Sequence, residues 1–407
     1  MAKPTLALIP ATQGSKFYSV LPSNGVGDFD FTRSGSATRI NKDGLIETVS
    51  NGVSRLNYPL VDGVVNGCPS HLLEPTKQNV LQRSEEFDNA YWINNGVTIN
   101  ANQTISPSGQ LNADLLTGVS GGFGVVRFST WSATNKVASC FAKKGSTNLF
   151  KIANVSSSNR YVLFDLSNGT VSEESVGWTG FIENYGNGWY RCSITGVIDT
   201  TGAIDFAPAP ADNDFLANAV GESIYLYGGQ LEINSSYATS YIPTEGSTVT
   251  RNQDVCTNGG SLASINSTEG VLYAEIAALA NSGTYRSVSL SNGTNANRVN
   301  LTYSTASNIL LGFINVNGVN TSFTFTVNPI TDFVKCALKY KNNDCSLWVN
   351  GVEISNSTSQ IAFPINTLTK LSFTSGSSSS NFFGKTKALA VWKEALSDSE
   401  LQSLTTI

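Results

Sequence analysis

Lys136-Val-Ala-Ser-Cys-Phe-Ala-Lys143 is the first of five stretches that decide the fold of this 407-residue chain. Four runs of the same character follow at 149–155, 160–166, 189–197 and 223–232. Turn pairs such as Asn168-Gly169 and Asn187-Gly188 separate them. Because successive side chains of a strand point to opposite faces, this alternation predicts antiparallel strands. Strands at this spacing, with no convincing helix between them, favour a two-sheet sandwich of jelly-roll type.

The composition also favours an all-β protein. Charged residues make up only 14% of the chain, against about 25% in a typical globular protein. Ser, Thr, Asn and 36 Gly replace them, which is typical of strands joined by short polar turns. The 20 Phe, 14 Tyr and 6 Trp argue against a disordered chain.

We expect three parts along the chain. Residues 1–78 are glycine-rich, with the Asp43-Gly44 hairpin signal, and are interpreted as an anchoring or oligomerisation segment with little core of its own. Residues 79–255 form the first β-sandwich, and residues 256–407 form a second one that follows it in tandem. Only short helices are expected. One helix of one or two turns is expected over 84–92, with Ser84 as its N-cap. Another is expected at the C-terminus, where Ser397-Asp-Ser-Glu400 forms a capping box.

Charge and hydropathy exclude several classes of function. The net charge is −5 and no Lys/Arg-rich run occurs, which disfavours nucleic-acid binding. No apolar run approaches the roughly 20 residues that a membrane span needs. The first residues lack the apolar stretch of a signal peptide, so we expect synthesis in a cytoplasm without export by that route.

Cysteine and histidine side chains are expected to be structural. The six cysteines include no C-x-x-C pair, and His71 is the only histidine, so a zinc site is not expected. Pairing through the turn at 341–344 would set Cys336 opposite Val349, and not opposite Cys345. We therefore expect free thiols in the core, and a packing or hydrogen-bonding role for His71.

No catalytic or metal-binding residue is predicted. Glu85-Glu86 and Glu173-Glu174 are adjacent carboxylates that point apart on a helix or strand, unlike the facing pair of a glycosidase. No cofactor is expected. Asp212 and Asp214 could supply oxygen ligands to a structural calcium ion, although their setting reads as a polar turn.

Sugar binding needs aromatic rings and neighbouring polar side chains, and several loops offer both. In the first sandwich Trp178 is expected to lie exposed in a loop, whereas Trp189 is expected to be structural. In the second sandwich the polar loops at 285–286 and 295–298 are candidates. The predicted ligand-binding residues are Trp178, Tyr185, Tyr285, Arg286, Asn295 and Arg298.

A series of short sequence motifs between Arg33 and Arg251 resembles, in content and order, a family of bacteriophage fibre and decoration proteins. The motifs before the first sandwich and at its start are Arg33, Ala37-Thr-Arg39, Gly44-Leu-Ile-Glu47, Arg55-Leu-Asn-Tyr58, Leu72-Leu-Glu-Pro75, Asn79 and Ser84-Glu-Glu-Phe87. Those of the first sandwich are Phe141-Ala-Lys-Lys-Gly145, Gly186-Asn-Gly-Trp-Tyr-Arg-Cys192, Tyr227-Gly-Gly-Gln-Leu-Glu232, Ser240-Tyr-Ile-Pro-Thr244 and Val249-Thr-Arg251, and they resemble the family's carbohydrate-binding-like jelly roll.

The second sandwich resembles a concanavalin A-like, laminin-G-type lectin module. The words that carry this resemblance are Gly270-Val-Leu-Tyr-Ala-Glu275, Leu347-Trp-Val-Asn-Gly351, Ala388-Leu-Ala-Val-Trp392 and Ala395-Leu-Ser-Asp-Ser-Glu-Leu401.

Together these resemblances imply a tail- or head-fibre protein on the virion surface, without enzymatic activity. It would form a homo-oligomer, most simply a trimer, and would contact other virion proteins through residues 1–78. Weak lectin-like sites held in many copies would give multivalent receptor binding and attachment to host polysaccharide or glycoprotein. The alternative is a structural decoration protein of capsid or tail that binds no ligand. A third class, a capsule depolymerase, would need a demonstrated release of oligosaccharides.

Overall fold

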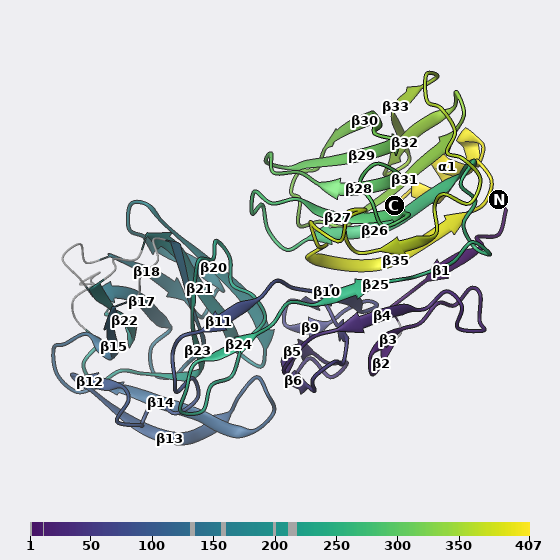
Figure 1. Cartoon of the computed structure of the whole chain (residues 1–407). Coiled ribbons are helices and arrows are strands. Elements are labelled where there is room, and N and C mark those ends of the chain that lie inside the picture. The colour runs from purple at the N-terminus through teal and green to yellow at the C-terminus, as the bar shows by residue number, and fades with distance from the viewer. Residues whose placement is uncertain (1, 11, 131–134, 156–159, 198–200, 211–217) are drawn as a thin grey trace.

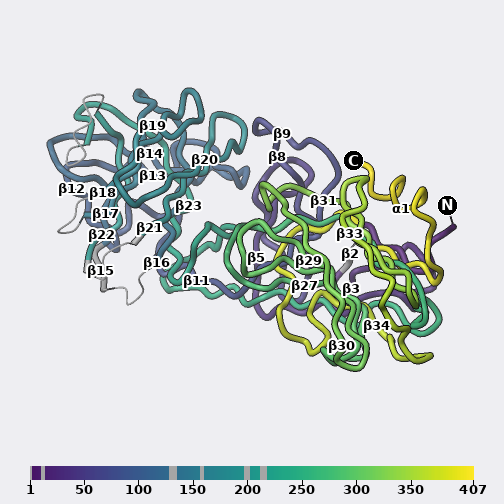
Figure 2. The backbone as a smooth tube through the Cα atoms, turned by 90° about the horizontal axis from the view of Figure 1, so that it is seen from above, coloured from purple at the N-terminus to yellow at the C-terminus, as the bar shows by residue number. Residues whose placement is uncertain are grey.

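The computed structural model describes all residues except 1, 11, 131–134, 156–159, 198–200 and 211–217. As the sequence predicts, it is an all-β protein built from antiparallel ladders. Two sandwiches lie side by side, with the N-terminal strands against the C-terminal one (Figures 1 and 2). None of the described residues forms a helix long and apolar enough to cross a bilayer.

The first of the two sandwiches consists of two sheets that enclose one apolar core. We call it the middle sandwich, because it follows the N-terminal segment and precedes the C-terminal sandwich. Phe150 and Ile152 of one sheet pack there with Cys140 and Ile194 of the other. One sheet has the order β13-β14-β23-β16-β21-β20; β11 also pairs with β23, and β24 pairs with β11. Its strands are β11 Lys77–Asn79, β13 Val97–Ile105, β14 Leu111–Gly118, β16 Asn135–Lys144, β20 Trp178–Gly186, β21 Trp189–Val197, β23 Ser223–Ile233 and β24 Val249–Arg251. The other sheet runs β12 Ile93–Asn95, β15 Gly124–Thr130, β22 Thr201–Pro208, β17 Leu149–Val155, β18 Arg160–Asp165 and β19 Thr170–Glu174.

The C-terminal sandwich also has two sheets around a shared core, in which Leu272 and Leu338 pack with Leu290 and Leu301. One sheet contains β33 Val352–Ser357, β32 Cys345–Val349, β31 Val334–Lys341, β26 Glu269–Ala278 and β35 Gly384–Trp392. The facing sheet runs β30 Val319–Thr326, β29 Ile309–Val316, β28 Arg298–Tyr303, β27 Arg286–Ser291 and β34 Lys370–Ser372.

The N-terminal strands are divided between the two sandwiches. β1 (Leu6–Leu8) and β10 (Ser70–Leu73) pair with β35, and β7 (Arg55–Asn57) pairs with β10, so they extend a sheet of the C-terminal sandwich. Strands β2 Thr12–Gln13, β3 Lys16–Phe17, β4 Phe29–Thr32 and β25 Val255–Thr257 form a small sheet of their own. The phenylalanines of β3 and β4 complete the C-terminal core. An early segment with little core of its own is thus built into the module farthest from it in sequence.

Two hairpins complete the N-terminal segment: β5 Ala37–Ile40 with β6 Ile46–Val49, and β8 Leu60–Val61 with β9 Val64–Val65. Ile40 and Ile46 pack with Phe141, Trp189 and Tyr227 of the middle sandwich. The sequence prediction of a hairpin at Asp43-Gly44 is confirmed, and this hairpin covers the outer face of a middle sheet.

The predicted helix over 84–92 is wrong. The chain forms successive turns there, with Asn89 N–H bonded to Glu86 and Trp92 N–H bonded to Asn89. The Ser84 hydroxyl is engaged by Tyr241 and Thr244 across the module and does not cap a helix. Tertiary partners for Ser84 therefore override its capping preference.

The C-terminal helix prediction is confirmed as α1 (Asp398–Thr405). The Glu400 carboxylate accepts from the Ser397 N–H at 3.0 Å, as in a capping box. Leu401 within the helix and Leu396 just before it are both buried.

The expectation of free thiols and that of a packing role for His71 are largely confirmed. Cys336 pairs in register with Val349, and all six thiols are free. Five of them are buried, whereas Cys68 is exposed, so the expectation of a core position is wrong for Cys68. His71 is fully buried and stacks on Phe17 with ring centroids 4.3 Å apart. Burial lowers the pKa of His71 to about 4, which keeps its ring neutral at pH 7.

Candidate functional site

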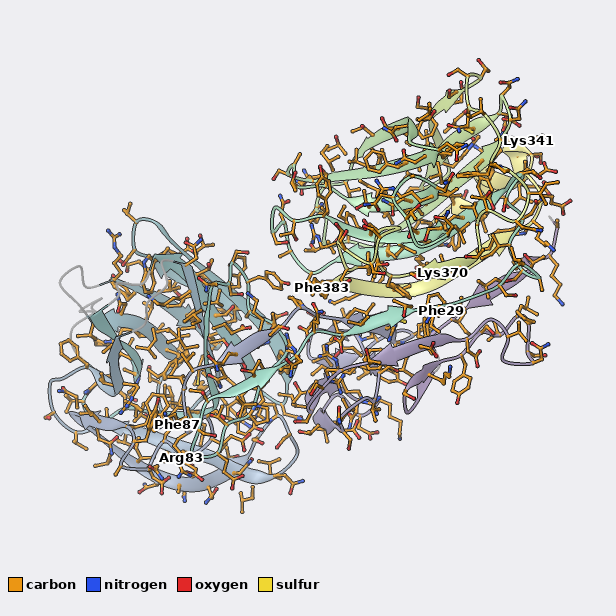
Figure 3. The ribbon with its side chains drawn as sticks, viewed as in Figure 1. Phe29, Arg83, Phe87, Lys341, Lys370 and Phe383 are labelled. Atoms are coloured by element: carbon orange, nitrogen blue, oxygen red, sulfur yellow. The ribbon has the colours of Figure 1, made fainter. Side chains whose placement is uncertain are left out.

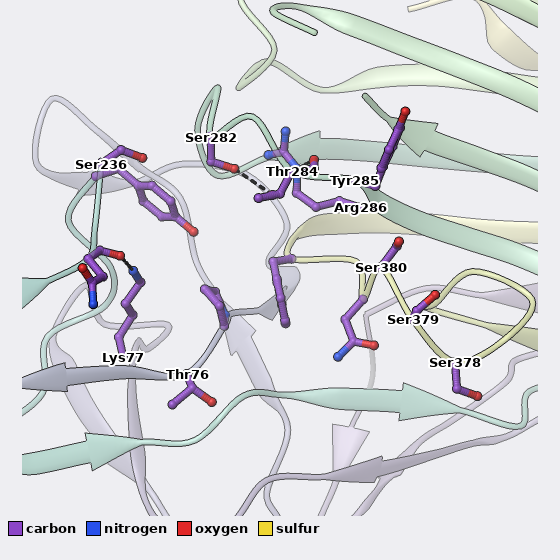
Figure 4. Close-up of a pocket in the computed structure, with 15 residues that line it drawn as sticks. Thr76, Lys77, Ser236, Ser282, Thr284, Tyr285, Arg286, Ser378, Ser379 and Ser380 are labelled. Atoms are coloured by element: carbon purple, nitrogen blue, oxygen red, sulfur yellow. Dashed lines mark hydrogen bonds between the residues drawn. The ribbon is translucent and has the colours of Figure 1, made fainter. Parts of the chain in front are cut away.

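A pocket of about 450 Å³ lies where the two sandwiches meet, and we call it the inter-module pocket (Figure 4). Four segments that are distant in sequence line it. Two come from the β10–β11 connection and the loop after β23, and two from the loops that precede β27 and β35 of the C-terminal sandwich. Its lining residues are Pro75, Thr76, Lys77, Asn234, Ser236, Tyr237, Ser282, Thr284, Tyr285, Arg286, Ser378, Ser379, Ser380, Asn381 and Phe383.

Tyr285 and Arg286, both predicted from sequence, lie in this pocket. The Tyr285 side chain is 48% exposed, whereas Arg286, the first residue of β27, is only 2% exposed. Arg286 Nε donates to the Thr284 carbonyl at 3.2 Å and Nη1 donates to the Ala280 carbonyl at 2.6 Å. Its guanidinium lies 5.4 Å from the centre of the Tyr303 ring. The loop before β27 therefore holds a fixed cation beside an accessible aromatic ring.

The opposite wall carries a second cation. Lys77, the first residue of β11, donates from Nζ to the Asn234 carbonyl at 2.6 Å. This bond ties β11 to the loop after β23. Burial lowers the pKa of Lys77, and Glu232 opposes that shift.

The remaining lining residues are mostly hydroxyl and amide side chains, with two further half-buried aromatic rings, Tyr237 and Phe383. Phe383 lies on the side of the C-terminal sandwich that faces the middle one (Figure 3). Aromatic rings surrounded by a few fixed polar groups are the usual lining of a small-ligand site. Ring faces can pack against sugar C–H groups while Ser, Thr and Asn bond to hydroxyls. The arrangement can therefore hold a polyhydroxylated ligand.

Asn295 and Arg298 lie next to this pocket, not in it. Arg298 Nη1 donates to Asn295 Oδ1 at 2.8 Å, and the Ser377 N–H donates to the same oxygen at 3.1 Å. The Arg298 guanidinium lies 5.9 Å from the centre of the Phe313 ring. The loop that carries Ser377 continues into the pocket wall at Ser378, so Asn295 is bonded to the loop that forms this wall.

The expectation that Trp178 is exposed in a loop is wrong. Trp178 begins β20, is 4% exposed and belongs to the middle core. It pairs in register with Gly196, and a Cβ at that glycine would lie 2.8 Å from the indole Cδ1 atom. The glycine leaves the space that the indole fills, so neither face of the ring is accessible to a ligand.

Tyr185 lies outside the inter-module pocket. Its ring is half-buried and meets Phe141 edge-to-face at 4.9 Å between centroids. Burial raises the pKa of Tyr185 to about 12. The residue lines a separate hollow of about 810 Å³ between the N-terminal hairpins and the middle sandwich, together with Val64, Ile105 and Trp189.

A buried ionic cluster lies at the junction of the N-terminal segment and the inter-module connection, and we call it the ionic junction. It consists of Arg33, Arg55, Glu74, Arg251 and Asp254. Glu74 accepts from Arg55 Nη1 at 2.5 Å and from Arg251 Nη1 at 3.0 Å. Asp254 accepts from Arg55 Nη2, from Arg33 Nη1 at 3.1 Å and from the Glu74 N–H at 2.8 Å.

Burial alone would raise the pKa of the Glu74 carboxyl, but Arg251, Arg55 and Ser240 outweigh it and hold that pKa well below its ordinary value. Four members of the ionic junction belong to the motifs that carry the phage-protein resemblance: Arg33, Arg55, Glu74 and Arg251. These motifs therefore have a structural role, because their side chains join segments that are distant in the sequence. The sequence analysis missed this role, since no local pattern marks a contact between residues 55 and 254.

The carboxylates that were weighed as catalytic groups accept hydrogen bonds from neighbouring residues. Glu85 accepts from the Tyr227 and Tyr241 hydroxyls, each at 2.9 Å. The predicted calcium ligands Asp212 and Asp214 lie outside the described residues. Within the part of the chain that the structure describes, no group of three or more His, Cys, Asp or Glu side chains is placed to hold a metal ion.

Comparison with known proteins gives limited similarity. No protein-family model and no curated protein matches the chain. Among solved structures, CBM40 of the Ruminococcus gnavus IT-sialidase, bound to α2,3-sialyllactose, is 20% identical over 34% of this chain and 83% of its own, with a TM-score of 0.30. The SAP-like pentraxin of Limulus polyphemus is 12% identical over 36% and 70%, with a TM-score of 0.28. Domains LG4-5 of the mouse laminin α1 chain are 10% identical over 83% and 95%, with a TM-score of 0.26.

These TM-scores are too low to carry a functional argument. The class of this protein is defined by its own strand pairing: two tandem antiparallel β-sandwiches with a polar, aromatic pocket between them.

Proposed function

We propose that this chain is a surface protein of a bacteriophage particle that attaches to host-cell glycans through the inter-module pocket, without catalysing a reaction. The observation that carries the binding proposal is the pocket itself. It places an exposed tyrosine ring, Tyr285, among hydroxyl and amide side chains supplied by both sandwiches. The phage assignment is supported by the ordered sequence words between Arg33 and Arg251.

Multivalency would make individually weak glycan sites sufficient for attachment to the host cell. One small pocket of this kind binds a few sugar units weakly, and copies held on one particle raise the avidity without new contacts. In this proposal the subunit forms a homo-oligomer, a trimer as in fibres. It contacts other virion proteins through its N-terminal segment and is displayed on the virion after synthesis in the host cytoplasm.

A glycan array probed with the purified full-length chain tests the binding proposal. Tyr285→Ala should reduce binding to any retained glycan about tenfold, which corresponds to about 1.4 kcal/mol for the loss of one ring contact. Tyr18→Ala is the matched control, because Tyr18 is 38% exposed and does not line the pocket. Binding that both variants lower equally would place the glycan elsewhere. Silence on the array and on host cells would instead favour the ligand-free decoration protein.

Labelling of intact virions with antibodies against this chain, viewed by electron microscopy, tests the localisation. Label on the head or tail surface is expected, and particles without label would contradict the virion assignment.

A further inference from the structure

The charged residues that line the inter-module pocket are all cationic. Among the described residues that line it, Arg286 and Lys77 are the two charged ones, and none is Asp or Glu. The chain as a whole carries 30 acidic and 25 basic residues, for a net charge of −5. The pocket is therefore locally positive although the protein as a whole is negatively charged. A cleft lined by charges of one sign concentrates ligands of the opposite charge.

Arg286 is buried, and among the described residues no carboxylate forms an ion pair with its guanidinium. Its Nη2 atom has no hydrogen-bond partner within the same part of the chain. The groups that its other nitrogens reach are two backbone carbonyls, those of Thr284 and Ala280. Arg55 and Arg251, which are buried to the same degree, both contact carboxylates in the ionic junction.

A buried charge is normally paired, because removing it from water is unfavourable. The pairing that Arg286 lacks within the described chain is one that an anion in the pocket would supply. Lys77 adds to this field from the opposite wall. Its ammonium group has three donors, and one of them is used by the Asn234 carbonyl.

We propose that the inter-module pocket selects acidic saccharides, sugar units that carry a carboxylate, over their neutral counterparts. This inference rests on the proposed glycan binding and narrows its ligand class. The carboxylate lies toward Arg286 and Lys77, and the remaining sugar surface lies against Tyr285 and the serine-rich loop at 378–380.

The test compares saccharides that differ in one group. Four acidic probes are used: oligogalacturonate, oligomannuronate, a hyaluronan tetrasaccharide and sialyllactose. Each is paired with the same saccharide after reduction of its carboxylate to a primary alcohol, and titration calorimetry measures their binding to the full-length chain. At least one acidic probe should bind about tenfold more tightly than its reduced form, and raising the salt concentration should narrow that difference.

Substitutions locate the selectivity. Lys77→Met should lower the ratio of acidic to reduced binding severalfold, and Arg286→Met should abolish it. Because Arg286 is buried and its variant could fail to fold, Lys77→Met is the decisive one. Lys144→Met makes the same change of net charge at an exposed lysine outside the pocket and should leave the ratio unchanged.

The outcomes separate this inference from the function it rests on. Equal binding of acidic and reduced probes, or array binding confined to neutral glycans, overturns the charge selectivity and leaves glycan binding intact. A loss of the ratio in Lys144→Met as large as in Lys77→Met also overturns it, because the effect would then come from net charge. If no glycan of any kind binds, the proposed function itself fails.

Discussion

The substitution Glu74→Gln tests whether the ionic junction holds the N-terminal segment to the inter-module connection. Glu74 is 2% exposed and follows β10 directly. Its carboxylate accepts from Arg55, Arg251 and both the N–H and hydroxyl of Ser240, at 2.5–3.0 Å. Glutamine keeps the shape but removes the charge, and it turns an NH2 group toward arginine donors. Asp254, which pairs with Arg33 and Arg55, would then be the one carboxylate left in the ionic junction, and Arg251 would lose the carboxylate that it contacts.

Breaking a buried ion pair by removal of one partner costs about 3–5 kcal/mol, because the remaining charge is left uncompensated. We expect Glu74→Gln to lower the free energy of unfolding by that amount. Urea denaturation followed by tryptophan fluorescence measures it. Glu47→Gln is the matched control: it removes the same group from the Arg39–Glu47 pair of the β5–β6 hairpin, which is partly exposed. Exposed pairs contribute at most about 1 kcal/mol.

The pH dependence gives a second measure of the same contact. Because the pKa of Glu74 is lowered by folding, its contribution is fully present above its ordinary pKa of 4.5 and is lost as the pH falls below that value. The wild-type chain should therefore lose this stability on acidification, and Glu74→Gln should not. A Glu74→Gln variant that loses no more stability than Glu47→Gln, with an unchanged acid profile, would refute the reasoning.

Three further predictions test which side chains are buried and which are exposed. Since folding lowers the pKa of His71 from 6.5 to about 4, the wild-type stability should fall by about 3 kcal/mol as the pH drops through that window, and His71→Leu should remove this slope. In the native state a thiol reagent should modify one of the six cysteines, and none after Cys68→Ser. Trp178→Ala should cost about 3–5 kcal/mol of unfolding free energy, whereas Phe181→Ala, at a residue that is 51% exposed, should cost less than about 0.5 kcal/mol.

Each of these has a result that would contradict it. An acid slope that His71→Leu leaves unchanged would assign that slope to other groups. Rapid labelling of more than one native thiol would place a second cysteine at the surface. A stable Trp178→Ala protein with weaker glycan binding would return Trp178 to the list of ligand contacts.

The sequence predicted those features that depend on local periodicity. Alternation of apolar and polar residues identified the all-β class and the strands on which both sandwiches are built. The turn at 341–344 established that Cys336 lies opposite Val349, because strand register follows from loop length. The capping box located α1, since helix ends carry short-range signals.

Local signals failed where distant partners decide the outcome. Ser84-Glu-Glu had the pattern of a helix start, but Tyr241 and Tyr227 bind these side chains and the chain turns instead. Trp178 had the surroundings of a loop, yet Gly196 on the neighbouring strand makes room for its indole. None of these three partners lies within 15 residues of the residue that it contacts.

The candidate site also combines features that the sequence predicted with features that only the tertiary structure decided. Sequence alone selected Tyr285 and Arg286 as an aromatic and a cation in a polar loop, and it determined that strands, turns and one C-terminal helix would form. Only the tertiary structure brought them to Lys77, Tyr237 and Phe383, because a pocket wall depends on which sheets pack together and not on the periodicity of any one strand. It also decided that β1, β7 and β10 would extend a sheet whose other strands begin at Glu269. Strands far apart in the chain pair through backbone groups, and this pairing leaves no local pattern in the sequence of either strand.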